Sequence, residues 1–370
     1  MNRHAVIISL KFAPGLPKEF FVIGDCLKAN GWFVSYILCK QYEGYLTGMM
    51  LNNDIHYIAT GNSMFEAFFK QRGRIVQQIC DTANSIAKAQ IGYICFYNPH
   101  PLNGQIMKQL EKKYPESKRA VVLHEPYVPI RERHKYGKVF GPIKMSLLDI
   151  FSYSLLHHCT DVILPSEHAM KLYKMRPVHI KNVNEHVIPL MLPPDNEPLN
   201  LKREPYVAFV GTINNARRVD EIFAAALNVF AEYPQIRFKV LTRQDVESKL
   251  PNVEIIRKKV ITDHEISDFL KNAYAVFLTH SVAAQSGNIP VAYRVGTPVI
   301  GFTVDGISQH IKNKQTGCLI HQEQFEKDMV AAIGYISGHI DEMIYECRSY
   351  FDTYFSGKLA GARYAWVNES

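Results

Sequence analysis

A glycine loop between two apolar runs carries the clearest chemistry in this sequence. Residues 274–306 read as a strand, a loop, a helix, a Gly-Thr-Pro turn and a second strand. The loop holds Ser286-Gly287-Asn288, placed directly before the expected helix. Backbone N–H groups at such a helix N-terminus attract phosphate, and the helix dipole adds to that attraction. The pattern therefore predicts a diphosphate site; an ordinary βαβ crossover that binds nothing is the alternative.

A histidine and a glutamate after a second apolar run could handle protons. His124 and Glu125 come directly after the expected strand Ala120–Leu123. A neutral imidazole can hydrogen-bond a hydroxyl or share a proton with a neighbouring group. Glu125 can act as a general base in a reaction that inverts the attacked carbon, provided that the attacking hydroxyl comes within about 3 Å. A histidine satisfied by nearby backbone is the alternative, and it is the simpler interpretation of His100.

Gly15 is a third candidate, in the loop between the first expected strand and the first expected helix. Because glycine has no Cβ, the backbone there can approach a ligand closely. A glycine that serves only a tight turn is the alternative.

These loops are positioned by strands that alternate with helices. In the first half we expect strands at Ala5–Leu10, Phe33–Leu38, Ile55–Ala59, Ile91–Phe96, Ala120–Leu123 and Asp161–Leu164. Helical patterns lie between them at Glu19–Asn30, Ser63–Ile86, Gly104–Tyr114 and Ile143–His158. Such alternation predicts a doubly wound parallel sheet, which binds ligands at the carboxyl ends of its strands.

A proline-rich linker leads to a second α/β half. Pro189, Pro193, Pro194 and Pro198 interrupt the pattern, because proline continues neither a helix nor a central strand. Strands follow at Tyr206–Val210, Arg237–Thr242, Val253–Arg257, Ala275–Thr279 and Pro298–Phe302, with helices at Arg218–Glu232 and Asp263–Asn272. We therefore expect an α/β protein of two tandem Rossmann-like domains, 1–190 and 200–352, with a ligand in a deep cleft between them.

The composition indicates a globular protein. A chain of 370 residues, 47% hydrophobic and 21% charged, is longer than one core usually grows. No apolar run approaches the ~20 residues that span a bilayer, and Ala5–Leu10 is too short for a signal-peptide core, so we expect a cytoplasmic protein. Seven cysteines without a Cys-x-x-Cys pair favour free thiols over a metal site or disulfides.

The net charge of +7 lies in the first half. Residues 1–200 hold 23 Lys and Arg against 16 Asp and Glu, whereas residues 201–370 hold 19 of each. Many of these cations fall between Lys108 and Lys144, namely Lys112, Lys113, Lys118, Arg119, Arg131, Arg133, Lys135 and Lys138. Such a patch predicts an anionic membrane surface, a phosphorylated acceptor or nucleic acid as partner, and a solvated basic face is the alternative.

Several segments, taken in order, resemble the GT-B glycosyltransferases, most closely family 4, over essentially the whole chain. In the second half the resemblance rests on Phe209-Val210-Gly211 with Arg217, Ile261–Leu270, Thr279-His280-Ser281, Gly296–Ile300, and Asp305-Gly306-Ile307 with Thr316-Gly317. In the first half it rests on Val121–Glu125, Asp161–Glu167 and His186–Pro189. Their order and spacing carry the resemblance, since no single segment is specific.

The resemblance implies a hexosyltransferase that moves a sugar from a UDP- or GDP-linked donor to a lipid-linked or other glycan acceptor, without a cofactor or a metal. The expected donor-binding residues are Gly15, Gly211, Arg217 with Arg218 as alternate, Ser281, Ser286, Gly287 and Asn288. His124 would lie against the donor sugar, and Glu125 beside it completes the expected catalytic pair. The first domain would hold the acceptor, at the inner face of a membrane. Residues 353–370, with a helix around Gly357–Trp366, would cross back to the first domain.

One departure keeps other functions open. The family's two glutamates, which contact the donor sugar and ribose, should fall near Ala283 or Ala284 and near Val291, where this sequence has no acid. A GT-B-fold partner protein without catalysis is therefore one alternative, and a nucleotide-sugar epimerase is another. Nucleic acid is not expected as a partner, because the basic segment lacks interleaved stacking aromatics.

Overall fold

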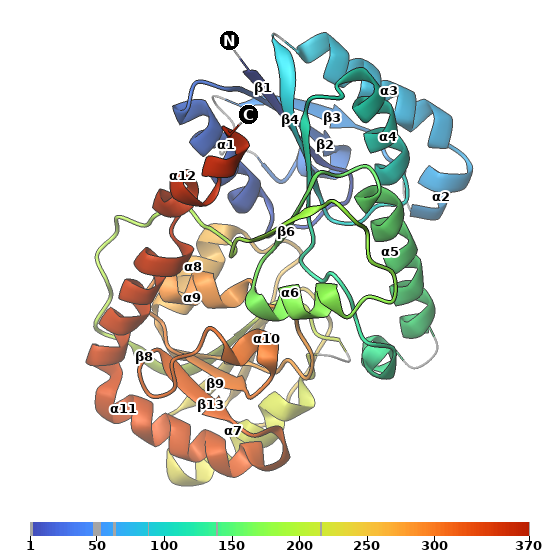
Figure 1. Cartoon of the computed structure of the whole chain (residues 1–370). Helices are drawn as coiled ribbons and strands as arrows, with labels where there is room; N and C mark the ends of the chain where they lie inside the picture. Colours follow the sequence, from blue (N-terminus) through green and yellow to red (C-terminus); the bar gives the residue numbers. More distant parts are fainter. Residues whose placement is uncertain are drawn as a thin grey trace. The chain divides into compact units, whose positions relative to one another are not determined.

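The chain folds into two compact units, each built on one parallel sheet (Figure 1). The computed structural model describes residues 3–46, 53–61, 64–87, 89–137, 140–214 and 217–369. Unit 1 comprises Met1–Pro129, Pro142–Met191 and Leu359–Ser370, and unit 2 comprises Ile130–Gly141 and Leu192–Lys358. The expected α/β class with two doubly wound sheets is confirmed.

The described part of unit 1 contains a parallel sheet with the strand order β3-β2-β1-β4-β5-β6-β7. The strands are β1 Arg3–Ser9, β2 Phe33–Cys39, β3 Asp54–Ile58, β4 Gln90–Tyr97, β5 Lys118–Val122, β6 Asp161–Leu164 and β7 Asn184–Val187. The central strands β1 and β4 are buried over nearly their whole length, as expected for a sheet covered on both faces. Strand order reverses between β1 and β4, which is where doubly wound sheets bind ligands.

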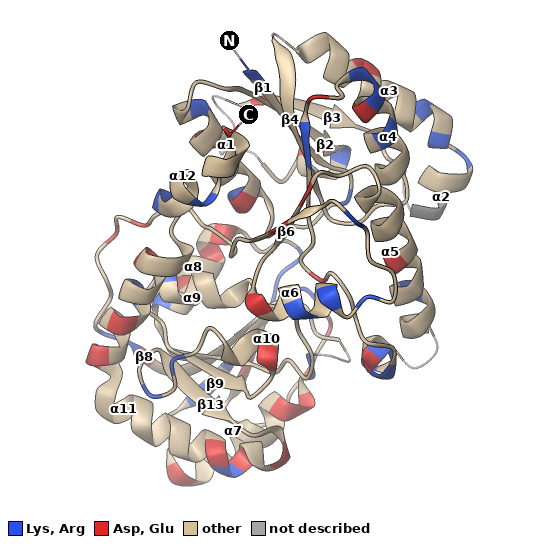
Figure 2. Cartoon of the chain, viewed as in Figure 1, with Lys and Arg blue, Asp and Glu red and all other residues tan. Residues whose placement is uncertain are grey.

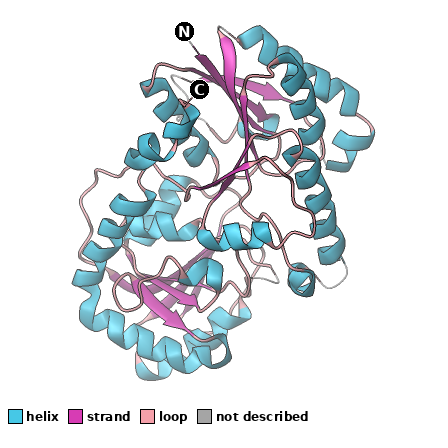
Figure 3. Ribbon diagram, viewed as in Figure 1, coloured by secondary structure: helices cyan, strands magenta, loops and turns pink. Residues whose placement is uncertain are grey.

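Helices surround this sheet (Figure 3). They are α1 Pro17–Ala29, α2 Met64–Phe69, α3 Arg72–Ile86, α4 Asn103–Lys113, α5 Phe140–Leu156 and α6 Glu167–Lys174. The single helix expected over Ser63–Ile86 is wrong: it breaks between α2 and α3, where Gln71 has the non-helical dihedrals φ −122° and ψ 5°. Ser63 itself lies outside the described residues.

The described part of unit 2 repeats this design with the strand order β10-β9-β8-β11-β12-β13. Its strands are β8 Glu204–Val210, β9 Arg237–Thr242, β10 Val253–Arg257, β11 Ala273–Leu278, β12 Val299–Phe302 and β13 Gly317–Ile320. Its helices are α7 Asp220–Glu232, α8 Asp263–Lys271, α9 Asn288–Arg294, α10 Asp305–Ser308 and α11 Phe325–Tyr350. Here the order reverses between β8 and β11.

Two segments lie in a unit that their position in the sequence does not suggest. Residues Ile130–Gly141 belong to unit 2, so the basic stretch between Lys108 and Lys144 is not one patch on one domain: Arg131, Arg133 and Lys135 are part of unit 2. Lys138 lies outside the described residues.

The chain after Lys358 belongs to unit 1. It forms the short helix α12 Ala360–Arg363 and a turn at Ala365–Val367, rather than one helix over Gly357–Trp366. Trp366 stacks on the imidazole of His186 with 4.0 Å between ring centroids, and Lys118 Nζ donates to the Trp366 carbonyl. Tyr364 and Val367 are buried in the same core as the helix α1. These contacts make the segment part of the unit 1 core.

No single helix in the described ranges is long and apolar enough to cross a membrane, although the bent pair Ile130–Tyr136 and Phe140–Leu156 meets both criteria together.

Candidate functional site

In unit 2, the loops after β8 and β11 meet at the carboxyl edge of the sheet. Arg217 follows β8, His280 follows β11, and the two residues form an isolated antiparallel backbone bridge. The bridge forms because β8 and β11 are neighbouring parallel strands, which place both following loops at the same edge.

The Arg217 guanidinium is a buried cation held by neutral groups. Its Nη2 donates to the Val210 carbonyl at 2.7 Å, and it lies 5.1 Å from the centroid of the Phe209 ring. Within the described ranges no Asp or Glu pairs with it, and its buried Nε has no hydrogen-bond partner. Burial lowers the pKa of Arg217 to about 10, so the side chain stays charged at neutral pH. A buried charge without a counter-ion is unfavourable unless an anion binds beside it.

Gly211 and Asn288 hold this arrangement together. Gly211 has φ +117°, and a Cβ there would lie 2.9 Å from Arg217 Nη1, so glycine is needed both for the backbone conformation and for the close approach. Asn288 Nδ2 donates to the Val210 carbonyl at 2.9 Å, the same oxygen that Arg217 uses. The expected loop before α9 is therefore tied to the end of β8.

Two further buried polar atoms lie at the end of β11. Among the described residues, His280 Nδ1 and Thr279 Oγ1 have no hydrogen-bond partner. Burial, and then the charge of Arg217, lower the pKa of His280, so the imidazole is neutral. Since buried polar groups in native proteins are nearly always satisfied, these atoms and Arg217 Nε mark this edge as a candidate site.

The remaining loop residues lie close by. Ser286 is buried and its Oγ accepts from the Asn288 N–H at 3.4 Å, while Gly287 is exposed. The Ser281 carbonyl accepts from Lys135 Nζ at 3.4 Å, which adds a second cation to this edge. Lys135 was not expected here, because it lies far away in the sequence. Arg218 is exposed and pairs with Asp220 at 3.8 Å, so it takes no part in this cluster.

The positions of the missing glutamates lie in an apolar environment. Ala283 and Ala284 are both buried, and Val291 packs against the apolar core of unit 2. A Cβ on Gly306 would lie only 1.9 Å from the Ala283 carbonyl oxygen, so the backbone is tightly packed there. A carboxylate at Ala283 would lose its hydration without gaining a partner.

Unit 1 brings titratable groups together at the carboxyl ends of β1, β4 and β5. Lys11, His100 and His124 follow these three strands in turn. Burial, and then Lys144, lower the pKa of Lys11, whereas Glu125 raises it. Burial and Lys11 lower the pKa of His100 to about 4, and His100 Nδ1 accepts from the Leu102 N–H at 3.3 Å. His100 is thus a turn histidine, as expected, but a buried one.

His124 faces an acid that the sequence did not suggest. Its Nε2 lies 3.5 Å from Oε2 of Glu19, a buried residue in the first turn of α1. Burial raises the pKa of Glu19 to about 8 and lowers the pKa of His124 to about 4. At neutral pH both are therefore uncharged, which suits hydrogen bonding to a hydroxyl better than base catalysis by His124.

Glu125 and Gly15 are exposed. The Glu125 charge acts on Lys11, so it belongs to the same edge of the sheet. A Cβ at Gly15 would meet open space, so glycine is not required there by packing.

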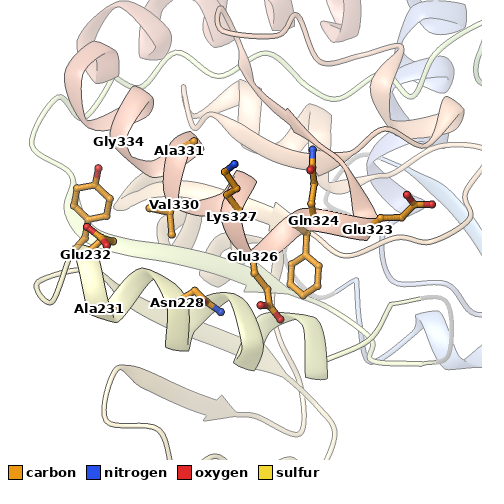
Figure 4. A pocket seen from close by; sticks show the side chains of 12 residues that line it. Asn228, Ala231, Glu232, Glu323, Gln324, Glu326, Lys327, Val330, Ala331 and Gly334 are labelled. Atoms are coloured by element: carbon orange, nitrogen blue, oxygen red, sulfur yellow. The ribbon is translucent and has the colours of Figure 1, made fainter.

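A separate groove of about 790 Å³ lies between α7 and α11 (Figure 4). It is lined by Glu232, Glu326 and Lys327 among others and shares no residue with the cluster around Arg217. In the part of the chain that the structure describes, no three His, Cys, Asp or Glu side chains are grouped so as to hold a metal ion.

Comparisons with known proteins identify a matching family model and similar solved structures. Residues 204–338 match the family model described as "Glycosyl transferases group 1". Sucrose-phosphate synthase from Thermosynechococcus elongatus is similar in structure, with 16% identity, a TM-score of 0.70, and coverage of 99% of this chain and 98% of that one. The pneumococcal O-GlcNAc transferase GtfA, solved with UDP and GlcNAc, has 11% identity, a TM-score of 0.69 and 99% coverage of both chains.

A TarM variant from S. aureus, solved with UDP and alpha-GlcNAc-glycerol, has 10% identity, a TM-score of 0.72 and 100% coverage of both chains. A search of curated sequences finds no match. The matched range 204–338 contains Gly211, Arg217, His280 and Asn288. The chain thus has the GT-B fold. The match of residues 204–338 to the glycosyl transferases group 1 model supports a glycosyltransferase.

Proposed function

We propose that this protein transfers a sugar from a nucleoside diphosphate sugar to a glycan or lipid-linked acceptor. The observation that carries the proposal is the buried Arg217 cation, which has no acidic partner in the described ranges. A diphosphate would supply the missing negative charge.

The proposed chemistry stabilises the departing diphosphate by fixed charge. As the bond between sugar and diphosphate breaks, negative charge grows on the diphosphate oxygens. A preorganised guanidinium in a site with little water stabilises that charge strongly. Arg217 is held in place by Val210 and Phe209, so it needs no rearrangement during the reaction. We propose that this stabilisation, with the N–H groups of Gly287 and Asn288, suffices without a metal.

Unit 1 is proposed to contact the acceptor. The neutral imidazole of His124 would hydrogen-bond a hydroxyl, with Glu19 fixing its position. Glu125, exposed at the same edge, is the candidate base if the reaction inverts the sugar carbon. We further propose that the protein works in the cytoplasm, at an anionic membrane face, because a lipid-linked acceptor would be found there.

The donor is proposed to be UDP- or GDP-linked. Structures of GtfA and TarM that contain UDP make uridine the first base to test. Calorimetry with UDP, GDP and ADP, followed by transfer assays with a panel of nucleotide sugars, tests the proposal. Micromolar binding of one nucleotide corresponds to about 8 kcal/mol and is expected for a donor site. Absence of nucleotide binding together with absence of transfer and hydrolysis would exclude the function.

A GT-B-fold partner protein without catalysis is the second candidate. It is favoured by Ala283, Ala284 and Val291, where the environment is apolar. Nucleotide binding without transfer or hydrolysis of any donor would select it over an enzyme.

A further inference from the structure

The helix α5 of unit 1 presents an uncovered apolar face. Ile143, Leu147 and Ile150 are 55%, 46% and 60% exposed. Their spacing of four and then three residues places them along one side of the helix. The opposite side, with Leu155 among others, is buried. This side of α5 therefore lacks the apolar contacts that its sequence could make.

The apolar surface continues onto α2. Phe69 of α2 is 67% exposed, and its ring centroid lies 5.0 Å from that of Phe68. Phe68 in turn lies 6.3 Å from Phe151 of α5. The ring contact of Phe68 with Phe151 thus brings α2 and α5 side by side. We call the exposed apolar side chains of these two helices, Phe69, Ile143, Leu147 and Ile150, the apolar face.

A basic groove adjoins the apolar face. It has a volume of about 420 Å³, and its lining includes Ser154 of α5 and His158 just beyond it, Arg72 of α3, and Lys108 and Lys112 of α4. Ser154 lies one helical turn beyond Ile150, so the groove begins where the apolar side of α5 ends.

The cations of this groove are available to bind an external anion. Among the described residues, Arg72, Lys108 and Lys112 form no ion pair with any acid. Figure 2 colours Lys and Arg blue and shows such residues on α3 and α4. Glu111, on the same helix as Lys108 and Lys112, is already held by Arg119 at 3.3 Å and by His158 at 2.8 Å. The groove therefore keeps a positive charge that no acid in the described part of unit 1 pairs with.

Arg72 joins the two surfaces. Its guanidinium carbon lies 5.5 Å from the Phe68 ring centroid, and its Nε donates to Gln105 in the basic groove. A planar cation that stacks on an aromatic ring can lie between apolar and polar surroundings. Arg72 thus links the basic groove to Phe68, the neighbour of Phe69 in the apolar face.

We propose that the apolar face and the basic groove together form a docking site for an anionic lipid bilayer. Lipid phosphates would bind in the groove, and acyl chains would cover Phe69, Ile143, Leu147 and Ile150. An interfacial helix combines apolar and cationic surfaces in this way. A second copy of the chain fits less well, because pairing of the same surface would oppose like charges. The inference refines the membrane location proposed above, but it can be tested without sugar transfer.

Co-sedimentation with vesicles tests the charged part. The protein is expected to bind vesicles of equal parts phosphatidylglycerol and phosphatidylcholine, and to leave pure phosphatidylcholine unbound. Lys108→Gln/Lys112→Gln should weaken binding by about fivefold for each cation removed. Lys249→Gln/Lys259→Gln changes the net charge equally at exposed positions of unit 2 and should bind as the unaltered protein does. Equal loss in both variants would overturn the proposal, since only total charge would then matter.

A variant of the apolar face and a control variant in unit 2 test the apolar contribution to binding. Leu147→Gln/Ile150→Gln should weaken vesicle binding by about tenfold or more, because less apolar area is buried in the bilayer. Leu227→Gln alters a side chain of unit 2 that is 58% exposed and should have no effect. Light scattering without vesicles distinguishes the other occupant: a dimer that Leu147→Gln/Ile150→Gln dissociates would overturn the proposal. Calorimetry with UDP is expected to be unchanged in all variants, so nucleotide binding and membrane docking can fail independently.

Discussion

The two units share one topology but differ in charge at the point where strand order reverses. In unit 1 the buried Glu19 and His124 face each other, and both are neutral. In unit 2 the buried Arg217 stays charged beside the neutral His280. The same arrangement of strands therefore supports a site suited to uncharged hydroxyls in one unit and a site suited to a permanent anion in the other. The difference arises from single side chains in the loops and helices that follow the strands, not from the sheets.

The largest effect is expected in unit 1, from Glu19→Gln. Because the folded pKa of about 8 lies above the usual 4.5, the contribution of Glu19 to stability is complete below pH 4.5 and is lost as pH rises through 8. Between pH 6.5 and 8, where His124 and His100 are neutral in the folded and the unfolded protein, thermal unfolding of the unaltered protein should therefore show stability falling by about 2 kcal/mol. Glu19→Gln should remove most of this loss.

Glu125→Gln is the control for that experiment, because it alters an exposed acid at the same edge of the sheet. It should leave the alkaline slope intact. Loss of stability as pH falls from 6.5 towards 4 should persist in both variants, since His124 and His100 have pKa values lowered to about 4. An unchanged alkaline slope in Glu19→Gln would mean that Glu19 is ionised in the folded protein, and the contrast between the units would disappear.

The next largest effect is expected in unit 2, from Arg217→Ala. Removing a charged hydrogen-bond donor should weaken nucleoside diphosphate binding by about 1.5 to 3 kcal/mol, or roughly 10- to 100-fold. Arg218→Ala is the matched control, because that neighbouring arginine is exposed and pairs with Asp220. Calorimetry with UDP and GDP measures both. Equal affinities in the two variants would place the phosphate site elsewhere.

A smaller effect is expected from Asn288→Ala. Loss of its bond to the Val210 carbonyl should loosen the loop before α9 and weaken nucleotide binding by about 1 kcal/mol. Asn228→Ala removes a comparable side-chain bond, to the Ala224 carbonyl within α7, and should not change affinity. Equal nucleotide affinities of the two variants in calorimetry would show that the hydrogen bond between Asn288 and Val210 does not contribute to donor binding.

Most of the sheet could be predicted because parallel strands buried on both faces are continuous apolar runs. The expected and observed bounds of β6, β9 and β10 are identical. The edge strand β7 was missed because its sequence, Asn184–Val187, is polar and largely exposed. It is held by pairing with β6 and by His186, whose Nε2 lies 2.8 Å from the Asp161 carboxylate. Such contacts follow from tertiary structure and leave no periodic signal.

The residues of the candidate sites, like the strands, could be predicted only in part from the sequence. Gly211 and Arg217 were candidates through the family resemblance, and Asn288 through the glycine loop before a helix. They lie at one edge because the loops after adjacent parallel strands meet there. Glu19 could not be predicted, since an acid in the first turn of a helix normally interacts with the helix dipole in solvent. Only the packing of α1 reveals that it is buried beside His124. Lys135 donates to the Ser281 carbonyl because its segment, Ile130–Gly141, belongs to unit 2 although the residues on both sides belong to unit 1. No local sequence pattern indicates this assignment.

The return of residues Leu359–Ser370 to unit 1 has a consequence for how this protein is made. Tyr364 and Val367 complete the core of unit 1, yet the whole of Leu192–Lys358 is synthesised before them. Domains usually fold as they emerge from the ribosome, the N-terminal one first. Here the apolar core of unit 1 stays incomplete until unit 2 has been translated. Unit 2, which is nearly continuous in the chain, can therefore complete its own core first.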